Sequence, residues 1–249
     1  MTDQETDPLS DLASANPDGP VPPRHRPWVR VVLAAGLALA LLFTGAAGGL
    51  VLGGLPDSSA PVVPAAGSVD VGFAQDMSVH HGQAVEMASW ERDHTTDPQL
   101  RLLAADIEDT QNGQIGQMQG WLALWGQAPL PSGRYMTWMT DPTDMADMPG
   151  MSRTTGAPTA GGVAAMPGMA SPADLTALRA ASGRQLDVLF LQLMLRHHLG
   201  GAGMASYAGQ HAGLPQVRNM AGQMLTAQTA EADYLRQLLA ARGATPLPN

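Results

Sequence analysis

Hydrophobic residues recur at helical spacing in two stretches of the chain, residues 68–125 and residues 171–243. This spacing predicts helices that each bury one face. The chain is also rich in Ala and Leu and contains only 4% aromatic residues, which favours helices over sheets. Each stretch is long enough for a helical hairpin. Two hairpins bury their faces economically as a four-helix bundle, so the predicted fold class is all-α.

Capping residues predict where the helices begin and end. Ser68 is a good N-cap for a first helix that runs to about His94, and Asp97-Pro98 places an N-cap before a proline at the first helical position. The second stretch gives three further boundaries: the start of a longer helix at Ser171-Pro172, a restart at Pro215 and an end at Gly243.

The two hairpins are copies of one another. Sliding the chain by 117 residues aligns DVGFAQDMSVHHGQAVEMASW, from Asp70, with DVLFLQLMLRHHLGGAGMASY, from Asp187. The matched pairs are Asp70/Asp187, Phe73/Phe190, Met77/Met194, His80/His197, His81/His198, Met87/Met204, Ser89/Ser206, His94/His211, Pro98/Pro215 and Gln111/Gln228. Six of the seven histidines fall into three equivalent pairs, so the sequence predicts an internal duplication.

The segment 31–55 has no charged residue and would be about 37 Å long as a helix, enough to cross a bilayer. Arginines lie immediately before this segment, and acidic residues follow it. The positive-inside rule then predicts a single-pass anchor with a cytoplasmic N-terminus and residues after 55 outside. A cleaved signal peptide and a secreted product form the alternative, because Val63-Pro64-Ala65 resembles a cleavage site.

The remaining segments carry little helical periodicity. Residues 1–30 are predicted to be a disordered cytoplasmic tail, and residues 56–67 a linker. Residues 126–170, between the hairpins, are rich in Pro, Gly, Thr and Met and are predicted to form a flexible loop. This loop contains Met-Pro-Gly-Met twice, at 148–151 and 166–169.

Charge and cysteine content exclude several classes of protein. A net charge of -9 without any lysine argues against nucleic-acid binding, which needs a basic surface. The absence of cysteine excludes disulfides, thiolate metal sites and cysteine nucleophiles.

Methionine and histidine share one face of the first and third predicted helices, and they repeat at the same offsets in both copies. The candidate ligands on these faces are Met77, His80, His81, Met87, His94, Met194, His197, His198, Met204 and His211. The accessory candidates in the loop are Met145, Met148, Met151, Met166 and Met169. Adjacent residues on a helix are rotated by about 100°, so one ring of each His-His pair should face the bundle and the other a neighbouring helix or solvent.

Imidazole and thioether together favour copper, because thioether sulfur selects Cu(I) and imidazole also binds Cu(II). The same residues are also compatible with a metal-independent interaction module, in which Met and His fill the core. A ferritin-like redox metalloenzyme is a third interpretation. Glu91 and His94 match the Glu-x-x-His of di-iron bundles, but the second copy has Ala208 in place of the glutamate. No hydrolase motif is present, so catalysis is not expected.

The doubled motif Asp-x-x-Phe-x-x-x-Met-x-x-His-His, followed each time by Met-Ala, resembles the family named domain of unknown function 305 over roughly residues 68–242. The resemblance implies a ferritin-like four-helix bundle, exported in most members, with some relatives binding copper through Met and His. Gly200, Gly201 and Gly203 depart from a regular helix, so the second copy is expected to be looser there, or kinked where a neighbouring backbone approaches.

The sequence as a whole therefore predicts a membrane-anchored copper-binding protein that buffers, sequesters or transfers the metal outside the cytoplasm. Its partners would be the metal ion and the membrane, with a protein partner or a homo-oligomer left open. Whether the two copies build one shared site or two separate sites is also open.

Overall fold

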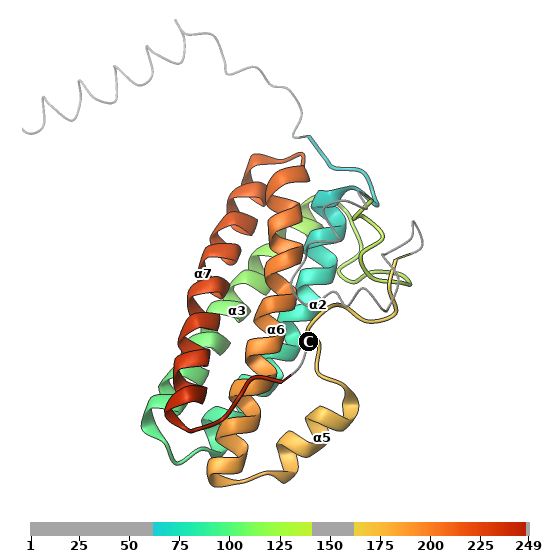
Figure 1. The fold of residues 1–249 in the computed structure, drawn as a ribbon. Coiled ribbons are helices and arrows are strands. Elements are labelled where there is room, and N and C mark those ends of the chain that lie inside the picture. The colour runs from blue at the N-terminus through green and yellow to red at the C-terminus, as the bar shows by residue number, and fades with distance from the viewer. Residues whose placement is uncertain (1–61, 141–161, 248–249) are drawn as a thin grey trace, which may run out of the picture. The chain divides into compact units, whose positions relative to one another are not determined.

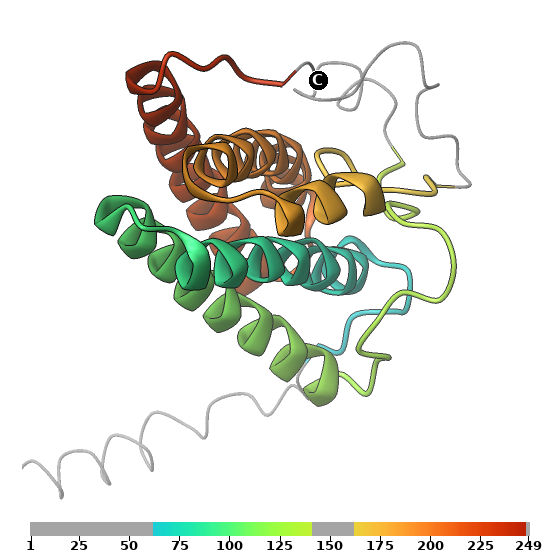
Figure 2. The ribbon, with the colours of Figure 1, turned by 90° about the horizontal axis from the view of Figure 1, so that it is seen from below.

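A computed structural model describes residues 62–140 and 162–247 of the chain. It contains five helices in these residues: α2 (Val69–His94), α3 (Pro98–Leu124), α5 (Pro172–Ala180), α6 (Gly183–His211) and α7 (Pro215–Ala241). The four long helices form a bundle, and short α5 lies along its side (Figures 1 and 2). Within the described ranges there is no strand, so the all-α prediction is confirmed for this part of the chain.

The predicted membrane helix at 31–55 and the predicted tail at 1–30 lie outside the described residues, as does the first half of the linker, residues 56–61. Among the helices that the structure does describe, none is both long enough and apolar enough to cross a membrane.

Three of the predicted helix starts are confirmed, two of them with a side-chain cap. The hydroxyl of Ser68 accepts a hydrogen bond from the backbone of α2, and the carboxylate of Asp97 accepts one from Gln99 N at 2.9 Å, at the start of α3. These two side-chain oxygens satisfy amide groups that have no partner within the helix. The last helix begins at Pro215, as predicted, without a side-chain cap.

The prediction of one longer helix from Ser171 is wrong. Ser171 caps α5 in a capping box with Asp174, but α5 ends at Ala180 and a new helix starts at Gly183. Gly183 has φ of +52°, a left-handed backbone conformation that breaks the helix and that glycine adopts without steric strain. The apolar periodicity continues across this break, so the sequence pattern did not reveal it.

The two hairpins are related by an approximate two-fold axis. Helix α2 packs against α3, α6 packs against α7, and the hairpins meet along α2 and α6, which run antiparallel. The carboxylate of Asp70 accepts hydrogen bonds from the amides of Gly213 and Leu214, at 2.9 and 2.8 Å. Its counterpart Asp187 accepts one from the Thr95 hydroxyl at 2.8 Å. Each copy therefore holds the loop of the other copy.

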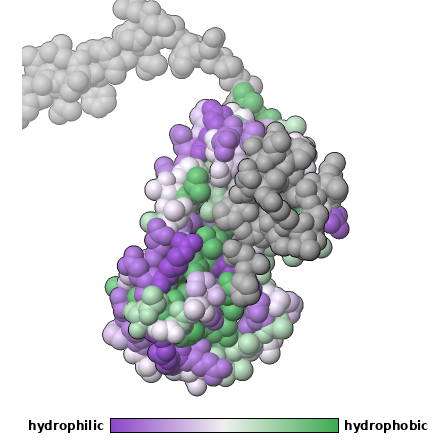
Figure 3. All heavy atoms as spheres, in the orientation of Figure 1, coloured by the Kyte–Doolittle hydropathy of each residue, from purple (hydrophilic) through white to green (hydrophobic). Residues whose placement is uncertain are grey.

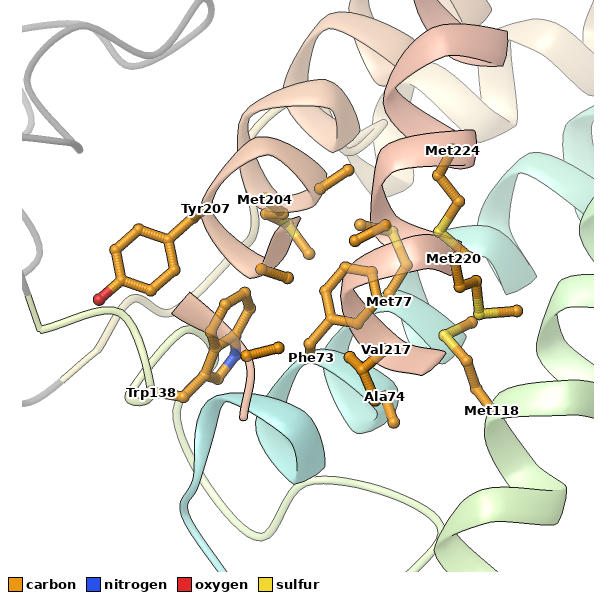
Figure 4. Packing of buried hydrophobic residues seen from close by; sticks show 14 of the residues in the cluster. Phe73, Ala74, Met77, Met118, Trp138, Met204, Tyr207, Val217, Met220 and Met224 are labelled. Carbon is orange, nitrogen blue, oxygen red and sulfur yellow. The ribbon is translucent and has the colours of Figure 1, made fainter. Parts of the chain in front are cut away.

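Buried hydrophobic residues form two clusters that contain equivalent positions of the two copies. The first cluster, which we call the Phe73 cluster, is shown in part in Figure 4. The second, the Phe190 cluster, contains the counterpart residue Phe190. The surface drawn in Figure 3 mixes hydrophilic residues with small hydrophobic areas wherever described residues are visible.

The described parts of the segment between the hairpins pack against the bundle. Asp76 on α2 accepts hydrogen bonds from Met136 N at 2.6 Å and from Trp138 Nε1 at 2.8 Å. Tyr135 and Val163 form an isolated antiparallel bridge, so both ends of the segment lie together. The side chains of Met136 and Trp138 are buried in the Phe73 cluster.

Candidate metal site

Four histidines lie buried where the two hairpins meet: His80, His81, His197 and His198. The ring centroids of His80 and His197 are only 3.8 Å apart, and the ring planes are tilted by 35°. These two residues are equivalent in the duplication, and antiparallel packing of α2 on α6 brings them to the approximate two-fold axis. The repeated motif therefore brings histidines of both copies together, and we call His80, His81, His197 and His198 the histidine centre.

The second ring of each pair faces the neighbouring helix of its own hairpin. His81 Nε2 lies 2.7 Å from Gln114 Oε1 on α3, and His198 Nε2 lies 2.5 Å from Glu231 Oε2 on α7. Within each pair the ring centroids are 6.4 and 6.3 Å apart. The prediction that the two rings of a pair diverge is confirmed.

Every one of these four rings uses Nε2 in a hydrogen bond. His80 Nε2 donates to the Pro167 carbonyl at 3.1 Å, and His197 Nε2 donates to the His80 carbonyl at 3.0 Å. A carbonyl or carboxylate oxygen can only accept, so Nε2 carries the hydrogen. The Nδ1 atoms of all four rings are buried and have no hydrogen-bond partner among the described residues.

Burial favours the neutral form of three of these rings. It lowers the pKa of His80 to about 4 and that of His81 to about 3, and it lowers the pKa of His197 well below the ordinary value. Neighbouring histidines lower each of the three pKa values further. A neutral imidazole with hydrogen on Nε2 presents a lone pair on Nδ1, which is the arrangement that metal-binding histidines adopt.

The structure places the helical methionines on both sides of the histidines. Met77 and Met204 belong to the Phe73 cluster, whereas Met87 and Met194 belong to the Phe190 cluster. All four are buried. Across residues 62–140 and 162–247, no group of three or more His, Asp or Glu side chains is arranged to hold a metal ion. A metal held by several of the four histidines therefore requires their rings to rotate.

His94 and His211 lie away from the four buried histidines. Each is the last residue of its helix and is exposed, and His94 is 14 residues beyond His80, roughly 20 Å along α2. The His94 ring stacks on Trp90 at 3.7 Å, and the His211 ring lies 4.2 Å from that of Tyr207.

The loop candidates are only partly described. Met166 is buried in the Phe73 cluster, and Met169 packs against that cluster. Met145, Met148 and Met151 lie outside the described residues.

The glycines of α6 allow a backbone to approach, and the helix remains continuous through them. A Cβ on Gly200 would lie 2.2 Å from the Pro167 carbonyl oxygen, the same atom that accepts from His80. A Cβ on Gly201 would lie 2.7 Å from Gln228 Oε1 and 3.1 Å from His80 Cε1. These two glycines therefore lie beside the four histidines. The expected approach of a neighbouring backbone is confirmed at Gly200, whereas the nearest atoms at Gly201 belong to side chains.

Sequence reasoning missed two residues of this centre, Gln114 and Glu231. They lie at equivalent positions of the 117-residue repeat, and each contacts the second histidine of its own copy. Extending the alignment along α3 and α7 would have paired them, although an amide and a carboxylate are not an obvious match.

Known protein families and solved structures include relatives with this architecture. The family model described as "Domain of unknown function (DUF305)" matches residues 70–239. The chain belongs to this family. It is 39% identical to a DUF305 protein of known structure from Streptomyces coelicolor, with a TM-score of 0.63, covering 74% of this chain and 100% of that one.

Two further structures are more distant. A DUF305 fragment from Deinococcus radiodurans is 28% identical, with a TM-score of 0.53, covering 72% of this chain and 99% of that one. CopM in its Cu(I)-bound form is 23% identical, with a TM-score of 0.50, covering 69% of this chain and 96% of that one, a likeness of fold alone. No curated protein matches the chain.

Proposed function

We propose that this protein binds copper as a cargo, which it buffers, sequesters or transfers without catalytic turnover. The observation that carries the proposal is the set of four buried Nδ1 atoms that have no hydrogen-bond partner among the described residues. Leaving a buried polar atom unpaired costs about 1–3 kcal/mol, and the duplication places four such atoms close to one another. A metal ion bound through Nδ1 of several of these rings, after the rings rotate toward one another, would satisfy those atoms.

Copper is the metal that fits this donor set best. Burial lowers the pKa of His80, His81 and His197, so these rings are neutral at neutral pH. Thioethers flank the histidines on both sides. Imidazole with thioether serves both oxidation states of copper, whereas magnesium and calcium require oxygen ligands. A fold relative, CopM, has been crystallised with Cu(I), which is consistent with the proposal.

A di-iron or other redox enzyme fits the geometry less well. The Glu91 carboxyl is fully buried, while the His94 ring of the same Glu-x-x-His is exposed and stacked on Trp90. These two side chains therefore do not share a coordination sphere. A metal-independent interaction module stays an alternative, and copper binding distinguishes it.

The test uses the full chain and two matched double variants. His80→Gln with His197→Gln removes both central imidazoles but leaves a side-chain amide to donate where Nε2 did. His94→Gln with His211→Gln removes the two exposed imidazoles. We expect the first variant to lose tight copper binding in a competition titration with a chelator, and the second to keep it. Equal copper affinity in both variants, with helical circular dichroism preserved, would favour the interaction module.

We propose further that residues 31–55 anchor the protein and hold the bundle outside the cytoplasm. The charge-free run preceded by arginines supports this topology. Protease added to spheroplasts should then remove the region after residue 56 and leave a membrane-bound N-terminal fragment. Recovery of a soluble protein starting near Ala66 would show instead that the segment is a cleaved signal peptide.

A further inference from the structure

Methionine is distributed unequally between the two hydrophobic clusters. The Phe73 cluster and the Phe190 cluster contain the same number of buried residues, 19 each. The Phe73 cluster contains eight buried methionines, and the Phe190 cluster contains two, Met87 and Met194. The backbone is therefore approximately two-fold symmetric, but the positions of the methionine side chains are not.

Three methionines account for the difference within the helices: Met118, Met220 and Met224. The 117-residue offset pairs them with Leu235, Leu103 and Ile107, which are buried at the equivalent positions of the Phe190 cluster. Leucine and isoleucine therefore fill these positions in one half of the bundle. Packing does not require thioethers at the same positions in the other half.

The thioether groups of these residues come together at one place. The side chains of Met118 from α3 and of Met220 and Met224 from α7 point toward one another, and Met77 from α2 lies beside them (Figure 4). The surrounding side chains are apolar, among them Phe73, Ala74 and Val217.

Such a donor set selects one class of ion. Thioether sulfur is neutral, polarizable and soft, and it binds Cu(I) in preference to hard divalent ions such as Mg²⁺ and Ca²⁺. An apolar environment penalises a double charge far more than a single charge, because the cost of burying an ion rises with the square of its charge. Ag(I), a soft monovalent ion like Cu(I), satisfies the same requirements.

One methionine of the group reaches the edge of the core. Met220 is the most exposed of the three, at 6%, while Met118 and Met224 are fully buried. Three methionines from the segment between the hairpins, Met136, Met139 and Met166, are buried in the same cluster. The same cluster therefore holds further thioethers.

We propose that Met118, Met220 and Met224, together with Met77, form a second binding site for a soft monovalent cation, Cu(I) or Ag(I). This site uses sulfur alone and is separate from the four histidines. It extends the proposed copper-binding function to a second set of ligands on the same bundle.

The experiment exchanges the residues between the two halves of the full chain. Met118→Leu, Met220→Leu and Met224→Ile introduce the side chains that fill the equivalent positions of the Phe190 cluster, so the variant should fold. We expect Ag(I) titration to show one fewer bound ion than in the parent. X-ray absorption of the Cu(I)-loaded variant should show fewer sulfur neighbours, with the nitrogen contribution retained. Unchanged Ag(I) stoichiometry in a folded variant would overturn the inference, and the methionines would be core filler.

Two further measurements separate this inference from the proposed function. The variant His80→Gln with His197→Gln should keep the sulfur-coordinated ion and lose the copper bound by the histidines. The methionine variant should do the reverse, and this combination of results supports two sites. If that histidine variant loses copper but the methionine variant does not, only the second site is refuted. If the parent binds neither copper nor Ag(I), both proposals are wrong.

Methyl NMR supplies a readout that does not depend on the triple variant. In the parent chain labelled with ¹³C-methyl methionine, Ag(I) should shift the signals of Met118, Met220 and Met224, assigned by single Met→Leu substitutions. Absence of these shifts at saturating Ag(I) would also overturn the second site.

Discussion

Glu91 makes the stability of the bundle depend on pH in a direction opposite to that of most carboxylates. Its carboxyl is fully buried on α2, and neither oxygen has a hydrogen-bond donor among the described residues. Burial, together with the neighbouring carboxylate of Asp187, raises the pKa of Glu91 to about 8. The folded protein therefore keeps a proton on Glu91 at neutral pH.

The sign and size of the effect follow from proton linkage. In the unfolded chain Glu91 loses its proton near its ordinary pKa of 4.5, whereas in the folded protein it keeps the proton up to about pH 8. Between these values the unfolded state binds one proton fewer, so the free energy of unfolding falls by up to about 1.4 kcal/mol per pH unit. Raising the pH from 5 to 7 should cost about 2–3 kcal/mol through this group alone.

Glu91→Gln removes this dependence because an amide does not ionise. The free energy of unfolding, from urea titrations followed by circular dichroism, should favour the variant over the parent by about 2–3 kcal/mol more at pH 7 than at pH 5. Asp109→Asn removes an exposed carboxylate from α3 and controls for the loss of one negative charge. A difference between variant and parent that is the same at both pH values would refute the reasoning.

Four further substitutions test the packing, the loop contacts and the protonation of the bundle. Gly200→Ala should destabilise the protein by about 1–3 kcal/mol in urea unfolding, because its Cβ would overlap the Pro167 carbonyl. Gly222→Ala on α7, where nothing lies within 4 Å, should instead stabilise it by about 0.5–1 kcal/mol. Asp70→Ala leaves two loop amides without their acceptor and should cost about 1–3 kcal/mol, measured in the same way. Because burial lowers the pKa of His80 to about 4, the unfolded state binds more protons between pH 4 and 6.5. Through this group the parent should therefore lose stability below pH 6.5, opposite in sign to the contribution of Glu91, and His80→Gln should lose less.

The helices and the pairing of equivalent residues could be predicted because both depend on local patterns. The caps at Ser68 and Asp97 mark helix starts, because the first amide groups of any helix need a hydrogen-bond acceptor. The 117-residue repeat identified which histidines are equivalent. The break before Gly183 was missed because the hydrophobic period continues through it. A left-handed glycine conformation depends on the turn that the surrounding structure imposes.

The grouping of the candidate ligands could not be predicted from one helical face. Met77 and Met87 share a face of α2, but ten residues separate them by about 15 Å, and they belong to different clusters. His94 shares the same face and lies further along the helix, beyond reach of His80. Helical periodicity gives the direction in which a side chain points, whereas its partners depend on where the neighbouring helices cross.

The antiparallel contact of α2 with α6 brings central residues of the two copies together. Residues near the middle of these helices meet their own counterparts, as His80 meets His197 at 3.8 Å. Residues toward the ends meet different partners, as Asp70 meets the loop at Gly213. In a duplicated hairpin, central residues can therefore contact their own counterparts in the other copy, while residues near the helix ends contact other positions. The sequences of the two copies differ in the same way. The four central histidines are identical in both copies, whereas Met118 of the first copy corresponds to Leu235 of the second.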